Sequence, residues 1–389
     1  MSKQHISKQR VSKQGLSGQT TASSLRARSA ACLASAAAAI LILSGCAAAA
    51  PAVLPSTPPA ASPESPTADG SPAAPAQAPT GPSTALPIAD IVPVAAAPTP
   101  VLPATFTDFS GASVTVRDVS RILALDLYGT LAQTVIGLGL GDNLVGRTTS
   151  DTDSAMDSLP TVTASGHELN AEAILALGPS VVLADKTIGP PETLEQLADA
   201  GITVVYFDPA RSVDGIDESI TAVGTALGVK DAAQQLNTRV AAELDEARRE
   251  IAAMVPAEKP AAAFLYIRGT GAVFFILGEG SGADGLISEL GARDVATEAG
   301  LAGTRPANAE ALAALNPEVL MVMSAGLEST GGVEGLLERP GIAQTAAGQN
   351  RRIVDLPDGQ ALNFGPGTPA TLLAAARALY APGTTAVSP

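Results

Sequence analysis

Apolar residues from about position 106 onward follow two alternating spacings. Short apolar runs are typical of buried strands, and the segments between them carry apolar residues at helical spacing. The predicted strands are 111–117, 120–125, 180–184, 203–207, 264–268 and 273–277, and the predicted helices are 128–139, 193–200 and 213–227. Because strand–helix alternation is typical of a parallel sheet covered by helices, the pattern predicts an α/β fold.

One segment in the middle of this region predicts a much longer helix. Residues 230–254 contain no Gly or Pro, and one face carries Leu236, Val240, Leu244, Ile251 and Met254. At about 1.5 Å per residue the helix would be close to 40 Å long, which is more than one small lobe needs. Pro256 and Pro260 follow it, and a second α/β run begins beyond them.

A short segment occurs twice, once on each side of this helix. The sequence Asn-Ala-Glu-Ala at 170–173 recurs at 308–311, and each copy leads through Leu and Pro into an apolar strand. Asn suits the start of a helix, and Glu suits the positive end of its dipole. A common way of building one βαβ unit explains part of this pattern, but two related lobes explain the identical residues better. We therefore expect two Rossmann-like lobes, 105–228 and 257–383, joined by a helix at 229–256.

The beginning of the chain has the pattern of an export signal. Six Lys or Arg and no acidic residue occur in positions 1–28, followed by a short apolar run and by Leu43-Ser44-Gly45-Cys46. This order is typical of a secretory signal peptide, here 1–45. The last four residues match the lipobox of bacterial lipoproteins, in which Cys46 is lipidated. A membrane-spanning helix is the alternative, but the run is shorter than about 20 residues and is rich in Ala.

Residues 46–104 are mostly Ala, Pro, Ser and Thr and have no apolar periodicity. Such a segment buries too little apolar surface to fold, so we expect a disordered stalk that holds the globular region away from the membrane. Residues 384–389 are expected to form a short tail.

Charge and cysteine content narrow the functions further. The chain of 389 residues has a net charge of −15, and its leader holds six positive charges, so the mature part carries about −21. An acidic surface argues against nucleic acid as a partner. Cys32 and Cys46 both lie in or at the end of the leader, so the folded part has no disulfide and no Cys nucleophile.

Two residues in the expected lobes are candidates for binding iron. His167 is the only histidine after the leader and precedes the first Asn-Ala-Glu helix, where a loop would line the crevice of a doubly wound lobe. In the second lobe, Tyr266 and Arg268 lie on one face of a strand, so the guanidinium would favour the phenolate. Tyrosine and imidazole both occur as haem ligands. Ordinary roles are also open: a polar surface position for His167 and a core position for Tyr266.

Together the lipobox, the repeated Asn-x-Glu segments and the long middle helix resemble the class III periplasmic-binding-protein-like family. That resemblance covers about 106–380 and implies a lipoprotein that carries siderophores, haem, cobalamin or metals to an ABC permease and its ATPase. In that family a glutamate on each lobe docks onto the permease, and the matching residues are Glu172 and Glu310. Electrostatic support of the helix start is their alternative role.

Four further segments resemble the haemin-binding lipoproteins of Gram-positive haem importers: 165–170, 188–191, 264–269 and 274–284. That resemblance implies haem held between His167 and Tyr266, with Arg268 supporting the tyrosine and Met323 lining the cleft. The chain departs from several relatives at Thr304, where an aromatic residue is expected, so stacking on the porphyrin is expected to be weaker there.

These patterns predict a monomeric haem-binding protein, tethered to the outer face of the cytoplasmic membrane, that is not an enzyme. The same scaffold carrying a ferric siderophore or cobalamin is the alternative. An α/β hydrolase fits less well because the chain has no Gly-x-Ser-x-Gly motif. A tetrahedral metal site also fits poorly, since one histidine without cysteine leaves only carboxylates.

Overall fold

The structure is a computed structural model that describes residues 79–164, 167–271 and 273–383, all within one compact unit. The expected signal peptide, the lipidated Cys46, the stalk up to residue 78 and the tail at 384–389 lie outside the described residues. No helix in the described ranges combines the length and the apolar character needed to span a lipid bilayer.

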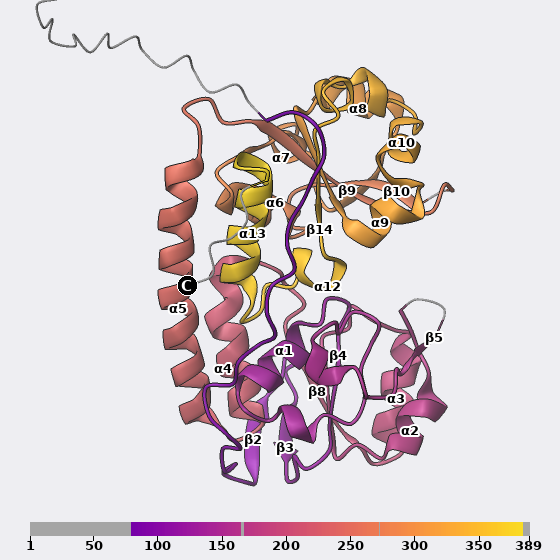
Figure 1. Cartoon of the computed structure of the whole chain (residues 1–389). Coiled ribbons are helices and arrows are strands. Elements are labelled where there is room, and N and C mark those ends of the chain that lie inside the picture. Colours follow the sequence, from indigo (N-terminus) through magenta and orange to yellow (C-terminus); the bar gives the residue numbers. More distant parts are fainter. Residues whose placement is uncertain (1–78, 165–166, 272, 384–389) are drawn as a thin grey trace, which may run out of the picture. The chain divides into compact units, whose positions relative to one another are not determined.

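The N-terminal lobe is built on a three-stranded parallel sheet in the order β4-β7-β8 (Figure 1). Its strands are β2 (Ala104–Thr107), β3 (Ser113–Val116), β4 (Ile122–Leu125), β5 (Thr163–Ala164), β6 (Glu168–Leu169), β7 (Val181–Ala184) and β8 (Thr203–Tyr206). Its helices are α1 (Thr130–Gly137), η1 (Gly141–Asn143), η2 (Ser154–Met156), α2 (Ala171–Leu177), α3 (Pro191–Asp199), η3 (Val213–Gly215) and α4 (Ile216–Ala226). The parallel sheet confirms the prediction for this half of the chain.

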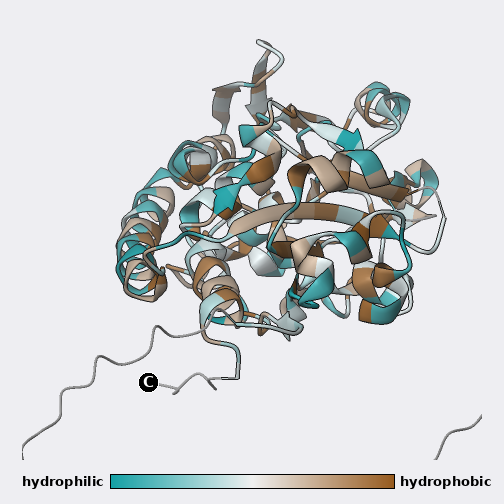
Figure 2. Ribbon diagram, turned by 90° about the horizontal axis from the view of Figure 1, so that it is seen from above, coloured by the Kyte–Doolittle hydropathy of each residue, from teal (hydrophilic) through white to brown (hydrophobic). Residues whose placement is uncertain are grey.

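The C-terminal lobe holds a seven-stranded sheet in the order β1-β14-β13-β9-β10-β12, with β11 beside β9. Its strands are β1 (Ser83–Thr84), β9 (Ala261–Arg268), β10 (Val273–Leu277), β11 (Arg293–Asp294), β12 (Thr304–Pro306), β13 (Val319–Met323) and β14 (Ile353–Leu356). Its helices are α6 (Ala283–Glu289), α7 (Val295–Glu298), α8 (Ala309–Leu315), α9 (Ser324–Ser329), α10 (Gly332–Leu337), η4 (Ile342–Gln344), α11 (Ala346–Gln349), α12 (Asp358–Ala361) and α13 (Thr368–Tyr380). Seen from above, apolar strands lie at the centre and polar helix faces lie outside (Figure 2).

One edge of this sheet differs from the expected parallel arrangement. Strand β10 runs antiparallel to β9 and also to β12. The loop between β9 and β10 is too short for a helical crossover, and a parallel neighbour requires such a crossover. The mixed sheet therefore follows from loop length, which the apolar periodicity does not report.

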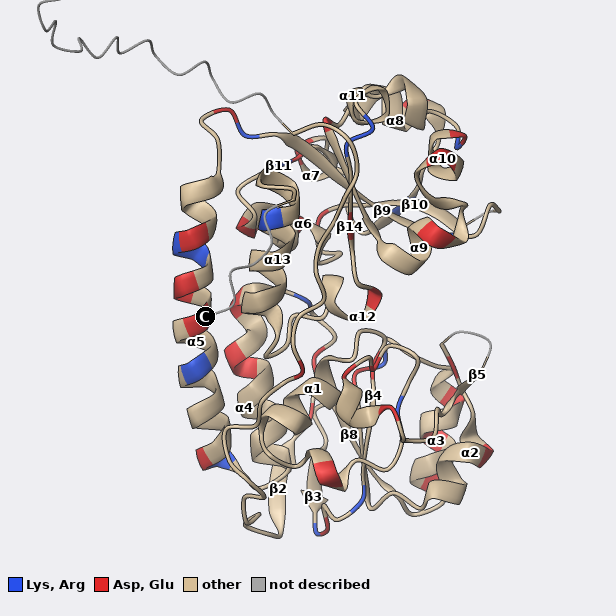
Figure 3. Cartoon of the chain, in the orientation of Figure 1, with Lys and Arg blue, Asp and Glu red and all other residues tan. Residues whose placement is uncertain are grey.

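The long helix α5 (Lys230–Met254) is confirmed. Its buried face includes Leu236, Val240, Leu244 and Ile251, as the spacing predicts, and Met254 is partly buried. The helix packs against α4 of the N-terminal lobe and α13 of the C-terminal lobe, so it runs beside both (Figure 1). Its outer face carries acidic and basic residues (Figure 3).

The two repeated segments form two helices with matching caps. The side chain of Asn170 accepts a hydrogen bond from the Ala173 N–H at the start of α2 (3.0 Å), and Asn308 accepts one from Ala311 at the start of α8 (2.9 Å). A residue in the left-handed conformation ends each helix. The predicted internal repeat is therefore confirmed as local structure.

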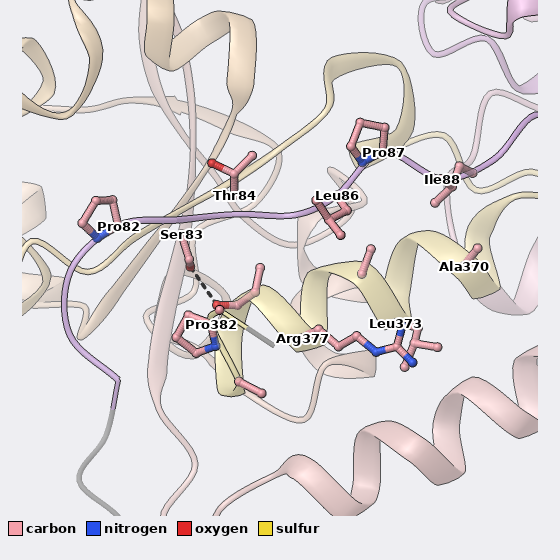
Figure 4. A pocket seen from close by; sticks show the side chains of 14 residues that line it. Pro82, Ser83, Thr84, Leu86, Pro87, Ile88, Ala370, Leu373, Arg377 and Pro382 are labelled. Carbon is pink, nitrogen blue, oxygen red and sulfur yellow. Dashed lines mark hydrogen bonds between the residues drawn. The ribbon is translucent and has the colours of Figure 1, made fainter. Parts of the chain in front are cut away.

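The expected stalk ends earlier than the sequence predicted. Residues 79–103, which we call the strap, lie on the folded unit and pass from one lobe to the other. At one end, β1 pairs with β14, and the Ser83 hydroxyl donates to the Ala378 carbonyl of α13 at 2.7 Å (Figure 4). At the other end, the Val94 N–H donates to Gly137 O and the Val101 N–H to Gly228 O, each at 2.9 Å.

A single buried arginine of the C-terminal lobe holds the start of the strap. Arg352 is 3% exposed, and its guanidinium donates to Gly81 O (3.1 Å), Ser83 Oγ (2.8 Å), Ala378 O (2.8 Å) and Leu379 O (2.6 Å). Burial lowers the pKa of Arg352 from its usual value. These four acceptors offset the cost of burying the charge.

Replacing Arg352 by methionine should therefore destabilise the fold. The substitution leaves several buried acceptors without a donor, so the free energy of unfolding should fall by about 1 to 3 kcal/mol in urea titrations. Arg351→Met is the matched control, because the side chain of the adjacent Arg351 forms an exposed ion pair with Glu334. Equal effects of the two substitutions would contradict this role of Arg352.

Candidate functional site

A cleft of about 880 Å³ is lined by residues of both lobes, and it holds all four residues predicted to bind the ligand. His167 belongs to the N-terminal lobe, whereas Tyr266 and Arg268 belong to β9 and Met323 to the end of β13. A second hollow of about 530 Å³ lies between the strap and α13 and contains none of these side chains (Figure 4). The cleft is therefore the candidate ligand site.

His167 stands just before β6, at the wall of the cleft. Its Nδ1 atom lies 3.5 Å from the Thr149 hydroxyl oxygen. Partial burial, and to a lesser degree the positive charge of Arg268, lowers the pKa of His167 from its usual value. At neutral pH the imidazole is therefore neutral, which is the form that binds a metal ion.

Tyr266 and Arg268 share one face of β9, as the alternation along a strand predicts. The Arg268 guanidinium lies over the Tyr266 ring, with its central carbon 4.9 Å from the ring centroid. Both side chains are partly exposed and line the cleft. Contact with the ring face restricts the conformation of the tyrosine.

The charge of Arg268 is held by a residue that the sequence did not indicate. Arg268 Nη2 lies 2.5 Å from Asp358 Oδ1, and the other oxygen of this carboxylate accepts the Ala325 N–H at 2.8 Å. Arg268 Nη2 also lies 3.6 Å from Met323 Sδ. The sequence predicted that the guanidinium supports Tyr266, and the structure shows that it also contacts a carboxylate and a thioether. Asp358 lies too far along the chain for spacing to reveal the pair.

Thr304, the first residue of β12, also lines the cleft and is exposed. It offers no aromatic surface to a planar ligand at this position. Ring contacts must therefore come from other residues that line the cleft.

A buried polar cluster on the N-terminal side of the cleft was not predicted. Asp126 follows β4, Asp185 follows β7 and Arg211 lies beyond β8, so all three occupy the carboxyl edge of the sheet. Arg211 is paired with Asp185 and lies 3.9 Å from Asp126. Burial and the nearby Asp126 raise the pKa of Asp185, and Arg211 opposes this shift. The sequence did contain a signal for these residues, because loops at the carboxyl ends of parallel strands line the ligand crevice of a doubly wound sheet.

Asp151 lies in the same region and titrates far from its usual range. Burial, reinforced by the Asp126 carboxylate, raises its pKa to about 7, although it accepts hydrogen bonds from the Thr148 N–H and hydroxyl and lies near Arg147. The folded chain therefore holds this proton at a pH where the unfolded chain, with a pKa of 3.8, has lost it.

The folded state thus binds more protons than the unfolded state between these two values, so its stability falls as pH rises through this window. We expect Asp151 to contribute a loss of about 2 kcal/mol in the free energy of unfolding between pH 5 and pH 8. Asp151→Asn should remove this part of the dependence, measured by denaturant unfolding at both pH values. An unchanged slope in the variant would contradict the assignment.

The two residues expected to dock onto a permease occupy equivalent places in the two lobes. Glu172 lies in the first turn of α2 and Glu310 in the first turn of α8, and both are exposed. Both are therefore accessible to a protein partner, while their charge also suits the helix starts.

Residues 126–359 match the family model described as periplasmic binding protein. The chain belongs to this family. Two lobes joined by one long helix, with a cleft between them, agree with the class III arrangement expected from the sequence.

A crystal structure of the heme binding protein HmuT is 50% identical, with a TM-score of 0.76 over 78% of this chain and 98% of that one. The uncharacterised ABC transporter substrate-binding lipoprotein YvrC of Bacillus subtilis is 25% identical over 67% of this chain and 81% of YvrC. A cobalamin-binding protein of Halobacterium salinarum is 34% identical over a smaller share, 36% of this chain and 39% of that protein.

Solved structures of HmuT include variants in which a single histidine, tyrosine or arginine is replaced by alanine. In HmuT that histidine precedes that tyrosine by the same number of residues as His167 precedes Tyr266 here. The arginine follows the tyrosine at the same interval as Arg268 follows Tyr266. The histidine, tyrosine and arginine replaced in those variants are thus spaced along HmuT as His167, Tyr266 and Arg268 are spaced along this chain.

Proposed function

We propose that this chain is the extracytoplasmic haem-binding protein of an ABC importer, which binds haem between its lobes and delivers it for import. The observation that carries the proposal is the cleft that brings His167 of one lobe and Tyr266 of the other to a common space. A neutral imidazole and a tyrosine are both known types of haem ligand. HmuT, which is 50% identical to this chain and is named a heme binding protein, supports haem as the transported ligand.

In this proposal, His167 and Tyr266 bind the iron from opposite faces of the porphyrin. Arg268 lies over the Tyr266 ring and holds the tyrosine in place as a ligand for ferric iron. Asp358 holds Arg268 in this place, and Met323 adds an apolar wall. The chain's own residues bind and orient the cargo, and the proposal assigns no catalytic residue.

Adding haemin to the purified chain tests this function. A Soret band that saturates at one haemin per chain supports the proposal. No Soret change, together with binding of cobalamin or a ferric siderophore, would overturn it in favour of the alternative cargo. Cobalamin must be included in this assay, because part of the chain is similar to a cobalamin-binding protein.

We further propose that the chain acts as a monomer and that Glu172 and Glu310 contact the permease, whose partner ATPase drives import. Replacing both by alanine should reduce haem uptake by cells while leaving haemin binding by the purified chain unchanged. Loss of haemin binding in the double variant would contradict a docking role.

The proposed monomeric state has its own test. Size-exclusion chromatography with light scattering of the purified chain should give a single peak at the monomer mass.

Cys46 is proposed as the lipidation site that anchors the chain to the outer face of the cytoplasmic membrane. Multiple acyl chains hold a protein at a membrane far more firmly than one chain does. The variant Cys46→Ala should therefore appear in the soluble extracytoplasmic fraction of cells. Retention in the membrane fraction after high-salt washing would contradict the anchor.

A further inference from the structure

Two aromatic residues that line the cleft, Tyr128 and Phe275, have no role in the proposed iron ligation, and Tyr128 is the one fixed in place by both lobes. Tyr128 lines the cleft from the N-terminal lobe, in the short connection between β4 and α1. The Arg211 guanidinium lies over its ring, with the central carbon 4.9 Å from the ring centroid. Tyr128 is partly exposed, and because it lines the cleft, a bound ligand can reach it.

The backbone of Tyr128 is fixed from both lobes. Its N–H donates to Asp126 Oδ1 at 2.8 Å, and its carbonyl accepts the Asn363 side-chain amide at 2.8 Å. Asp126 belongs to the N-terminal lobe, whereas Asn363 lies between α12 and α13 of the C-terminal lobe. Tyr128 is therefore held at the point where the two lobes meet.

The cation that covers the ring is fixed as well. The side chain of Arg211 is 8% exposed and is paired with Asp185, with Asp126 at 3.9 Å. Asp126 thus restrains both the backbone of the tyrosine and the guanidinium above its ring. A side chain held in this way loses little conformational entropy when a ligand binds.

The ion pair with Asp185 also limits how Arg211 can contact a ligand. Among the described residues that line the cleft, Arg211 and Arg268 are the Lys or Arg side chains, and each is already paired with a carboxylate. Neither is a free cation for the acid groups of a ligand. Support of an aromatic ring is therefore the better explanation for Arg211.

We propose that the Tyr128 ring is a flat, preorganised contact for the porphyrin plane, supplied by the N-terminal lobe and held in place by Arg211. The inference rests on the proposed haem-binding function and adds a residue that determines affinity for the macrocycle itself. Aromatic surfaces favour offset stacking on other π systems. Thr304 of the C-terminal lobe offers no ring, so Tyr128 adds an aromatic contact from the N-terminal lobe to the one that Phe275 offers from the C-terminal lobe.

Two variants separate the ring of Tyr128 from its hydroxyl. Tyr128→Leu removes the ring, and Tyr128→Phe keeps it. Each is titrated with haemin and with iron-free protoporphyrin IX, which needs no axial ligand. We expect Tyr128→Leu to bind both compounds about fivefold to tenfold more weakly, with the Soret maximum of the haemin complex unchanged, and Tyr128→Phe to stay within about twofold of the parent.

Tyr206→Leu is the matched control, because Tyr206 also lies under a cation (Lys186 Nζ at 4.4 Å from its ring centroid) but does not line the cleft. It should bind both compounds like the parent. Parent-like affinity of Tyr128→Leu overturns the inference while the haem-binding function stands. Equal losses in the Phe and Leu variants, or a shifted Soret maximum, overturn it in favour of a role for the hydroxyl. If the parent chain binds no haemin, the proposed function itself fails.

Discussion

Haemin affinity should fall by about 100-fold or more when Tyr266 is replaced by phenylalanine, and the Soret band of the remaining complex should shift. Loss of residues that only orient a metal ligand costs about 10- to 100-fold, so loss of the ligand itself should cost at least as much. The substitution keeps the ring on which Arg268 lies, so the packing of β9 should be preserved. Absorbance titration with haemin gives both the affinity and the band position.

His167→Ala serves as the complementary variant. It should also shift the Soret band, because it removes the ligand of the other lobe and leaves one axial position to water. The parent should lose affinity for haemin at low pH, when His167 becomes protonated. Because the pKa of His167 is lowered, this loss should occur at a lower pH than for an ordinary histidine. A parent-like Soret band in the Tyr266→Phe complex would contradict the proposed ligation.

Replacing Asp185 by alanine should destabilise the fold by about 3 kcal/mol. The substitution leaves the Arg211 guanidinium, 8% exposed in the intact chain, without its closest carboxylate. Breaking a buried ion pair by removing one partner costs about 3 to 5 kcal/mol, and we expect the lower end because Asp126 remains 3.9 Å from Arg211. Denaturant unfolding followed by circular dichroism measures the change.

An exposed ion pair provides the control for this prediction. Glu298 pairs with Arg293 at 2.6 Å, but both side chains are about half exposed, so Glu298→Ala should change stability little. A loss in Asp185→Ala no greater than in Glu298→Ala would show that the buried cluster does not stabilise the fold. The haemin affinity of Asp185→Ala should also fall modestly if Arg211 supports the Tyr128 ring.

Local sequence patterns predicted most of the secondary structure because local chemistry controls it. The apolar face of α5 repeats at helical spacing over its whole length, with no Gly or Pro to interrupt it. Asn170 and Asn308 cap their helices with their own side chains, so the sequence alone indicates where both helices begin. Such features depend on residues within one or two turns.

The strap shows why the sequence did not predict some of the ordered segments. Its composition suits a disordered stalk, and β1 has only two residues. The strap is ordered by distant partners, above all Arg352, which binds Gly81 and Ser83 from the far end of the chain. A segment of low intrinsic stability folds when another part of the chain supplies the acceptors and donors it needs.

The sequence by itself determined the α/β class, the two-lobed plan, the pairing of Tyr266 with Arg268 and the candidates for iron ligation. These rest on periodicity, on helix caps and on resemblance to a family. Only the tertiary structure placed His167 and Tyr266 in one cleft and brought Asp358 to Arg268. It also placed Tyr128 beneath Arg211 and ordered the strap across both lobes. The physical reason is that these contacts join residues far apart in the chain, and their positions depend on how whole lobes pack.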